Sequence, residues 1–266
     1  MMRAADRSPF CAGMTGATLI FLYLPLAIVV LFSFHAVPSL SFPFAGFSLR
    51  WYREVFASAE FMDSVRNSAI VGAACALTTL VLGTMAAYGL TRVSPRLQAL
   101  AGLLFFVPIT LPGLFLGLAL LVFFAQAKIS LSLATVVVGH LIFVFPYFLL
   151  VARAALDRLD SALEEAAADL GATPWQVFWR VTMPQVWPVL AGATALAFAL
   201  SVDEFVITFF VIGPQSTLPM YIWSSLRRTI DPSINTVSSL LLLLSLLLFA
   251  VAFALTMWKR PGRRWQ

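Results

Sequence analysis

The chain has 266 residues, 61% of them hydrophobic and only 11% charged, with a formal net charge of +5. Such a composition excludes an ordinary soluble globular protein and indicates a polytopic membrane protein. The basic residues are scattered between apolar stretches instead of forming one patch, which argues against nucleic-acid binding.

Six apolar stretches are long enough to cross the hydrocarbon core of a bilayer. They cover residues 14–34, 67–90, 99–125, 131–152, 187–211 and 236–258. The first is longer than the apolar core of a typical signal peptide, so we expect it to remain as an uncleaved span. We therefore expect one all-α transmembrane domain over residues 1–266, with six transmembrane helices and no separate soluble domain.

Positive charge is distributed unevenly between the two sides of these spans. The side that holds both termini carries the larger share of the 17 Lys and Arg residues, namely Arg3, Arg7, Arg92, Arg96, Arg153, Arg158, Arg180, Lys259, Arg260, Arg263 and Arg264. Because cytoplasmic segments are enriched in Lys and Arg, we expect the N- and C-termini to be cytoplasmic.

Aromatic and charged residues mark two segments on the opposite, outer side. Residues 35–66 follow the first span and predict an interfacial helix, and residues 217–232 have a similar composition. Tyr221 and Trp223 in the second segment are candidates for a binding site. The alternative is that they belong to the aromatic belt at the membrane interface.

The third and fourth spans contain prolines and one histidine. Pro108, Pro112 and Pro146 each remove an internal helix hydrogen bond, which predicts shaped helices or kinks near a gate. His140 has no second ligand at a recognisable spacing, so we expect a packed or hydrogen-bonded residue and no metal site. The chain also lacks a G-x4-G-K-[ST] phosphate loop and a visible catalytic constellation, so we expect a non-catalytic protein that binds no nucleotide.

Residues 157–184 form a long polar segment between the fourth and fifth spans. Ser161 followed three residues later by Glu164 has the form of a capping box, so we expect a short helix to begin there. Gly171 suits the left-handed residue at the end of that helix. The segment would lie at the cytoplasmic surface of the membrane.

A second short helix is expected directly after this turn. Thr173, Pro174 and Gln176 have the spacing of a capping box with proline at the first helical position. Pro184 should end this helix, because proline disrupts a helix interior. The predicted result is a helix, a sharp turn and another helix.

Two acidic residues stand inside the fifth span. An ionised acid near the centre of a span costs roughly 2.5–3.5 kcal/mol, so Asp203 and Glu204 require compensation. On a continuous helix the face of Glu204 also carries Thr194, Ala197, Ser201 and Thr208. This face is expected to line a hydrated path or a helix interface. The alternative is that the acids pair with a structural Arg or Lys or lie at the outer headgroups.

A family resemblance emerges from the polar segment. Its residues Glu165-Ala166-Ala167, Gly171 and Val181-Thr182-Met183-Pro184 match the signature E-A-A-x3-G-x9-I-x-L-P, with Val for Ile and Met for Leu. The chain thus resembles the permease subunits of binding-protein-dependent ATP-driven (ABC) importers, which implies the type I importer permease fold in a bacterial cytoplasmic (inner) membrane. The ATPase-coupling residues implied are Glu164, Glu165, Ala166, Ala167, Gly171 and Pro184. By resemblance, Glu165 would offer its charge to the ATPase.

Other residues resemble the spermidine/putrescine permease branch. These are Ser201-Val202-Asp203-Glu204-Phe205-Val206, Gly213-Pro214, Thr217-Leu218-Pro219-Met220 and Trp223-Ser224-Ser225, together with Asn67-Ser68. The resemblance implies half of a translocation path for a small solute, with a cationic polyamine as leading cargo. Candidate path residues are Ser201, Asp203, Glu204, Thr208, Tyr221 and Trp223.

The resemblance also implies a set of partners. These are a second permease subunit, two ATP-binding cassette subunits that use ATP and Mg, and an external solute-binding protein; the chain itself would bind no cofactor. An amino acid, an opine or a phosphonate stays open as cargo. A proton-coupled secondary transporter using Asp203 or Glu204 as a relay, or a membrane-embedded enzyme, would be an alternative from another class.

Overall fold

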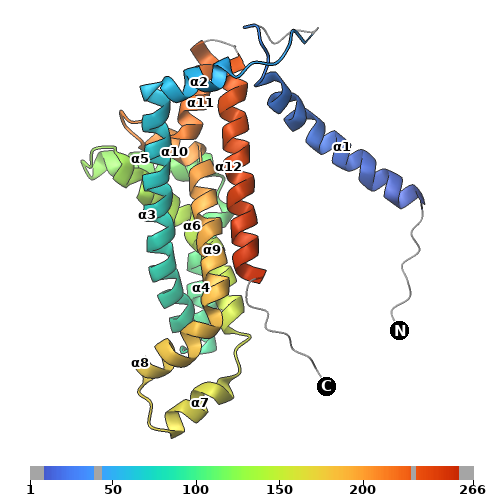
Figure 1. Ribbon diagram of the computed structural model, residues 1–266. Coiled ribbons are helices and arrows are strands. Elements are labelled where there is room, and N and C mark those ends of the chain that lie inside the picture. The colour runs from blue at the N-terminus through green and yellow to red at the C-terminus, as the bar shows by residue number, and fades with distance from the viewer. Residues whose placement is uncertain (1–8, 39–43, 229–231, 258–266) are drawn as a thin grey trace. The chain divides into compact units, whose positions relative to one another are not determined.

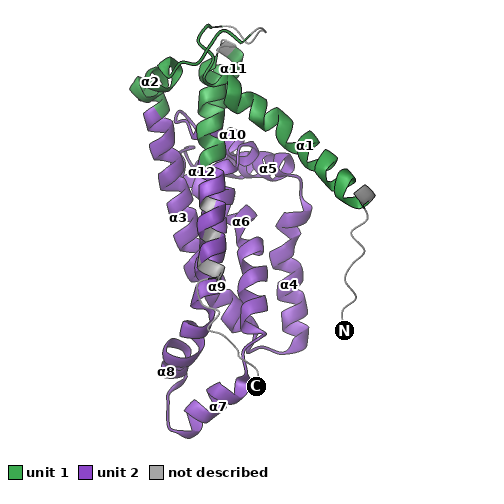
Figure 2. Ribbon diagram, turned by 45° about the vertical axis from the view of Figure 1, so that its right-hand side comes forward, with its two compact units in different colours: residues 1–61, 222–243 green, residues 62–221, 244–266 purple. Residues whose placement is uncertain are grey.

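The computed structural model describes residues 9–38, 44–228 and 232–257 (Figure 1). Arg3, Arg7 and the basic cluster from Lys259 to Arg264, which carry much of the orientation argument, lie outside these residues. In the described part of the chain the secondary structure is helical, apart from an isolated bridge between His35 and Phe47. The chain divides into two compact units, residues 1–61 with 222–243 and residues 62–221 with 244–266 (Figure 2).

The first unit contains α1 (Pro9–Phe32), α2 (Arg50–Ala57), most of α11 (Leu218–Arg228) and the first half of α12 (Pro232–Met257). Only 6% of the most apolar window of α1 is buried, so its surface must be covered by lipid or by another chain. The amphipathic α2 is the helix predicted after the first span, and it buries Trp51 and Val55. The Trp51 indole donates a 2.7 Å hydrogen bond to the His35 carbonyl, which ties α2 to the end of α1.

The second unit contains the remaining helices. These are α3 (Ala59–Leu90), α4 (Pro95–Thr110), α5 (Gly113–Gln126), α6 (Leu133–Leu156), α7 (Ser161–Asp169), α8 (Pro174–Val177), the π-helical turn η1 (Phe178–Thr182), α9 (Met183–Asp203) and α10 (Val206–Val211). Within the described residues, five continuous helical stretches are long and apolar enough to cross a membrane, and a bent pair makes a possible sixth span.

That bent pair lies within the third span expected over residues 99–125, where the prolines predicted a shaped or kinked helix. The chain turns by 102° between α4 and α5. Leu111 is extended (φ −86°, ψ 128°) because the ring of Pro112 disfavours helical geometry in the residue before it. α5 consequently lies across the direction of α4 and α6 (Figure 2). Pro108 and Pro146, in contrast, are accommodated inside α4 and α6.

α6 packs against α4, α5, α9 and α10, so it is central to this unit. Small residues permit this close packing. A Cβ on Gly139 would lie 2.8 Å from Ile207 Cγ2, and one on Gly117 would lie 2.7 Å from the Phe210 ring. The glycines therefore bring α6 and α5 up against α10.

Candidate functional site

The polar segment begins with α7, which starts at Ser161 as predicted but has a different capping residue. Asp160 is the capping residue, and its carboxylate accepts a 3.0 Å hydrogen bond from the Ala162 amide. Ser161 is the first helical residue, so the predicted capping box between Ser161 and Glu164 is wrong. Aspartate is a much better N-cap residue than alanine. Because Asp160 caps the helix, the Glu164 carboxylate is available for other contacts.

The end of α7 is the turn that Gly171 predicts. Gly171 has φ +84°, in the left-handed region. The Ala172 amide donates to the Ala167 carbonyl at 3.1 Å and the Gly171 amide donates to the Ala168 carbonyl at 2.8 Å. This pair of bonds is a Schellman motif, which satisfies carbonyls that the end of a helix leaves unpaired.

The start of α8 also follows the sequence. The Thr173 hydroxyl accepts from the Gln176 amide at 3.4 Å, and the Gln176 side chain accepts from the Thr173 amide at 2.9 Å. Pro174 occupies the first turn. The predicted capping box is confirmed.

The helix does not end at Pro184, contrary to the prediction. It passes through η1, where the Met183 amide donates to the Phe178 carbonyl five residues earlier, and continues into α9. The wider π-turn alters the hydrogen bonding that precedes Pro184, and Pro184 stands at the start of α9, where a missing amide proton is tolerated. The second short helix is therefore joined to the fifth span without a break.

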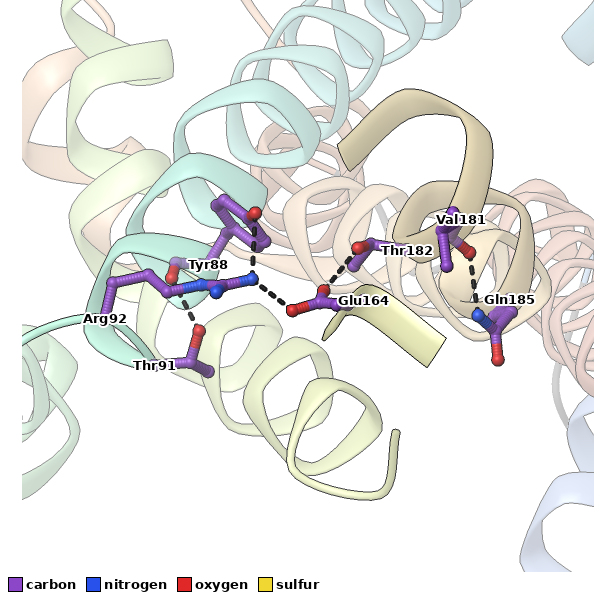
Figure 3. A network of polar contacts seen from close by, with 7 residues as sticks. All are labelled: Tyr88, Thr91, Arg92, Glu164, Val181, Thr182 and Gln185. Atoms are coloured by element: carbon purple, nitrogen blue, oxygen red, sulfur yellow. Dashed lines mark hydrogen bonds and ion pairs between the residues drawn. The ribbon is translucent and has the colours of Figure 1, made fainter. Parts of the chain in front are cut away.

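Glu164 connects three parts of this region (Figure 3). Its Oε2 accepts a hydrogen bond from Arg92 just after α3, and its Oε1 accepts one from the Thr182 hydroxyl in η1. The same Arg92 nitrogen donates to the Tyr88 hydroxyl at 2.9 Å. The Glu164 side chain is only 19% exposed. The neighbouring Glu165 is exposed and has no hydrogen bond or ion pair within the described residues.

An open cavity of about 370 Å³ lies beside this network, between α7, α8 and the end of α3. Its lining includes Tyr88, Arg92, Glu164, Glu165, Pro174 and Val177. The surface of the polar segment also exposes large apolar side chains, with Leu170 at 90% and Trp175 at 69%. Exposed apolar groups of this size beside an unpaired acid are typical of a surface that another molecule covers.

The second candidate region is a break in the fifth span. α9 ends at Asp203, Glu204 is extended (φ −74°, ψ 111°), and a new helix, α10, begins at Val206. The expected continuous helix over residues 187–211 is therefore wrong. The Glu204 carboxylate accepts a 2.9 Å hydrogen bond from the Ile207 amide, so it satisfies the first turn of α10 in the manner of a helix cap.

Asp203 has a different environment from its neighbour. It is exposed in this chain, and its two carboxylate oxygens accept from the Ser245 hydroxyl of α12 at 3.1 and 3.3 Å. Among the described residues, neither Asp203 nor Glu204 forms an ion pair with Lys or Arg. The compensating groups are a hydroxyl for Asp203 and a backbone amide for Glu204.

His140 of α6 bridges the break. Its Nδ1 lies 2.8 Å from the Ser201 hydroxyl on α9, and its Nε2 lies 2.8 Å from the Thr208 hydroxyl on α10. The Thr208 hydroxyl already donates to the Glu204 carbonyl at 2.8 Å, so it accepts from an Nε2–H of His140. Ser201 then donates to Nδ1. His140 is thus the hydrogen-bonded intramembrane residue that the sequence predicts, and the described residues contain no cluster suited to a metal ion.

The two aromatic candidates lie on α11. The Arg227 guanidinium stands 4.9 Å from the centre of the Trp223 ring. One face of Trp223 therefore already holds a cation from the chain itself. The Tyr221 amide donates to the Thr217 carbonyl at 2.8 Å as α11 begins.

Comparison with known proteins identifies the family. Residues 79–264 match the family described as binding-protein-dependent transport system inner membrane component. The chain belongs to this family. It is a multi-pass permease subunit of an ABC importer, as the coupling motif predicts.

Curated relatives resemble the permease over most of its length. It is 36% identical over 231 residues to the putrescine transport system permease protein PotI of Escherichia coli K12, covering 84% of this chain and 82% of the relative. It is 26% identical over 251 residues to the spermidine/putrescine transport system permease protein PotC of the same strain, covering 94% and 95%. A putative 2-aminoethylphosphonate transport system permease protein, PhnV of Salmonella typhimurium LT2, is 28% identical over 222 residues, covering 82% and 83%.

Solved structures share the permease fold. A chain of the bacterial ABC transporter that imports alginate superimposes with a TM-score of 0.76 at 14% identity, covering 94% of this chain and 96% of that one. The MetNI methionine ABC transporter gives 0.60 at 19% identity, covering 75% and 98%. At these identities the likeness establishes the fold alone.

Sequence reasoning about the permease missed two sets of partners. Arg92 and Thr182 are distant in sequence from Glu164, and only the folded chain brings them to it. The bridge from His140 to Ser201 and Thr208 did leave a signal. Ser201 and Thr208 are seven residues apart, which places them on one helical face, and they lie on either side of the two acids. The fourth span contains a single histidine, His140, that could pair with these hydroxyls.

Proposed function

We propose that this permease forms half of the translocation path of an importer for a cationic polyamine such as putrescine or spermidine. The names of its relatives PotI and PotC support this cargo. The observation that carries the proposal is the carboxylate of Asp203, which is exposed at the end of α9 and, among the described residues, has the Ser245 hydroxyl as its one hydrogen-bond partner. A cation passing along the chain would meet this negative charge.

The broken helix strengthens the preference for a cation. A helix C-terminus carries partial negative charge on its last carbonyls, and α9 ends next to Asp203. The opposite partial charge at the start of α10 is met by Glu204. We therefore assign Asp203 to the path and Glu204 to the shape of the break, with Ser201 and Thr208 held by His140. Helix ends within the membrane serve ion sites in other transporters in the same way.

The polar segment would be the docking surface for the ATPase. Glu165 is exposed and offers its charge, Ala166 and Ala167 allow close approach, and Gly171 makes the turn. Pro184 sets the junction with the fifth span. We infer that two ATP-binding cassette subunits bind and hydrolyse ATP with Mg, while this chain contributes no catalytic residue and binds no cofactor.

The complete transporter would contain a second permease subunit and an external solute-binding protein as well. The termini and the docking surface would face the cytoplasm of a bacterium, because the basic residues favour that side. Binding of ATP by the partners would favour one arrangement of the spans over another, which shifts the population between inward and outward access.

ATP-driven uptake in vesicles that hold the assembled complex tests this function. Labelled putrescine and spermidine are compared with an amino acid, 2-aminoethylphosphonate and an anionic solute, each with the natural protein and with Glu165→Lys. The proposal requires polyamine uptake that depends on ATP and is lost in Glu165→Lys. Asp169→Asn serves as the matched control, because Asp169 is another exposed acid on α7.

Each of the other outcomes would contradict a different part of the proposed function. Uptake of another solute, still dependent on Glu165, would retain the importer and refute the polyamine. Transport without ATP would favour a proton-coupled secondary transporter. Chemical conversion of the solute by the purified chain would indicate an enzyme.

A further inference from the structure

We propose that Glu164 is a positioning residue that ties the docking helix α7 to the membrane spans, and not a contact of the ATPase. It would carry displacement of α7 to α3 and α9. This inference rests on the proposed function in one respect, namely that the ATPase docks on α7. It separates the roles of two adjacent acids that the family resemblance grouped together.

The first argument is that both oxygens of Glu164 are already engaged. One accepts from Arg92 after α3 and the other from the Thr182 hydroxyl in η1 (Figure 3). Thr182 is only 1% exposed, so its hydroxyl is committed to the interior of the unit. A partner subunit would have to break this arrangement to use Glu164, whereas Glu165 is exposed beside it.

The second argument is that Arg92 is itself held in place. Its guanidinium donates to the Tyr88 hydroxyl at 2.9 Å and lies 4.7 Å from the centre of the Tyr88 ring. That ring meets Phe178 of η1 edge to face, with centroids 4.7 Å apart. Glu164 thus binds to residues of two segments, the end of α3 and η1, that also contact each other. The resulting ring of contacts is closed and rigid.

The third argument is that α7 has little else to fix it. The helix contains no buried residue. Within the described part of the chain, Glu164 is the one side chain of α7 with hydrogen bonds to other elements. A helix without buried contacts is free to move locally, so this carboxylate decides where α7 stands relative to the spans. A partly exposed ion pair contributes little to stability, and its role here is geometric.

The test uses the full permease assembled with the ATPase subunits and binding protein of its own transport system. Glu164→Gln removes the charge, and Thr182→Val removes the hydroxyl at similar volume. Asp169→Asn is the matched control on the same helix, and Glu165→Lys is the comparison for lost docking. Copurified ATPase, ATP hydrolysis with and without binding protein, and putrescine uptake are measured for each.

Glu164→Gln and Thr182→Val should retain the natural amount of bound ATPase while uptake falls about 5-fold or more, the lower end of typical coupling between sites. Hydrolysis should continue but lose its response to the binding protein. The double variant should lose less than the sum of the two single losses, because the two residues share one hydrogen bond of the network. Glu165→Lys should instead lose the ATPase itself.

A distance measurement separates positioning from a general loss of structure. Spin labels at Asp169→Cys on α7 and Arg96→Cys on α4 report the position of α7, in a Cys11→Ser background since Cys11 is exposed and Cys75 is buried. The distance distribution should broaden in Glu164→Gln and stay unchanged in a Glu165→Gln variant.

Two results would overturn the proposal. Loss of the ATPase from Glu164→Gln would place this residue on the docking surface, and natural uptake with an unchanged distance distribution would leave it no role. If Glu164→Gln does not fold, Thr182→Val decides by the same measurements. Failure of the proposed function is seen separately, as absence of ATP-dependent uptake by the natural complex, and the distance measurement still decides whether Glu164 fixes α7.

Discussion

Replacing His140 with phenylalanine tests the bridge across the broken fifth span. The imidazole is 1% exposed and makes two 2.8 Å hydrogen bonds, to Ser201 on α9 and Thr208 on α10. Phenylalanine keeps an aromatic ring in the space but removes both bonds. The change therefore isolates the polar bridge from the packing around it.

The size of the effect follows from what each hydroxyl retains. A side-chain hydrogen bond between membrane helices contributes about 0.6 kcal/mol on average and up to about 1.7 kcal/mol, so two bonds give a loss of roughly 1–3 kcal/mol. Thr208 still donates to the Glu204 carbonyl, and a serine inside a helix often bonds to its own backbone. These retained bonds favour the lower half of that range.

Unfolding in mixed micelles by increasing SDS, followed by circular dichroism, measures this loss. A cycle with Ser201→Ala and Thr208→Val should give a positive coupling of His140 to each hydroxyl. Thr84→Val is the matched control, because Thr84 is buried in α3 and its hydroxyl has no hydrogen-bond partner among the described residues. The free energy of unfolding of the Thr84→Val variant should differ from that of the natural protein by less than about 0.5 kcal/mol. The reasoning would be refuted if His140→Phe behaved like Thr84→Val, or if the couplings were zero.

Three further predictions concern backbone strain and charge. Gly213→Ala should lower the free energy of unfolding by more than about 2 kcal/mol in the same SDS assay, because φ is +73° and the new Cβ would lie 2.5 Å from the Leu131 carbonyl oxygen. Gly171→Ala should lower the stability of the turn by only about 1–2 kcal/mol, because the new Cβ would contact no other atom. Faster amide hydrogen exchange confined to α7 should reveal this loss, and Gly171→Asn should recover part of it. Asp203→Asn should raise the KM for putrescine about tenfold, consistent with the loss of one partly exposed ion contact, whereas Glu204→Gln should mainly lower stability by about 1 kcal/mol through the weakened cap. Equal KM values for the two acid variants would contradict the division of roles between Asp203 and Glu204.

Local chemistry was sufficient to predict the turn of the polar segment and the cap of its second helix. Gly171 and the pair Thr173 and Gln176 act through bonds to residues at most a few positions away, so spacing alone predicts them. Asp160 displaced Ser161 as the cap because two adjacent residues were both suitable, and the sequence offers no rule to choose between them.

The two interrupted spans show the limit of such reasoning. Hydropathy detects apolar length but not continuity, so residues 99–125 and 187–211 each read as a single helix. Leu111 is extended because a proline follows it, and this break left a signal in the sequence. The break at Glu204 has no proline or glycine at that point. It depends on partners from other helices, including His140, and those contacts exist only in the folded chain.

The π-turn at residues 178–182 has a consequence for the register of the chain. An α-helix advances by about 100° per residue, so one additional residue in a turn rotates everything before it relative to everything after it by about that angle. The face that α8 presents is therefore one residue out of phase with the face that α9 presents within the unit. Removing a single residue from the turn would restore the ordinary helical repeat and turn the polar segment about the axis of the fifth span, even if all other side chains of the segment were kept. In this permease the length of the five-residue π-turn therefore sets the direction in which α8 faces relative to α9.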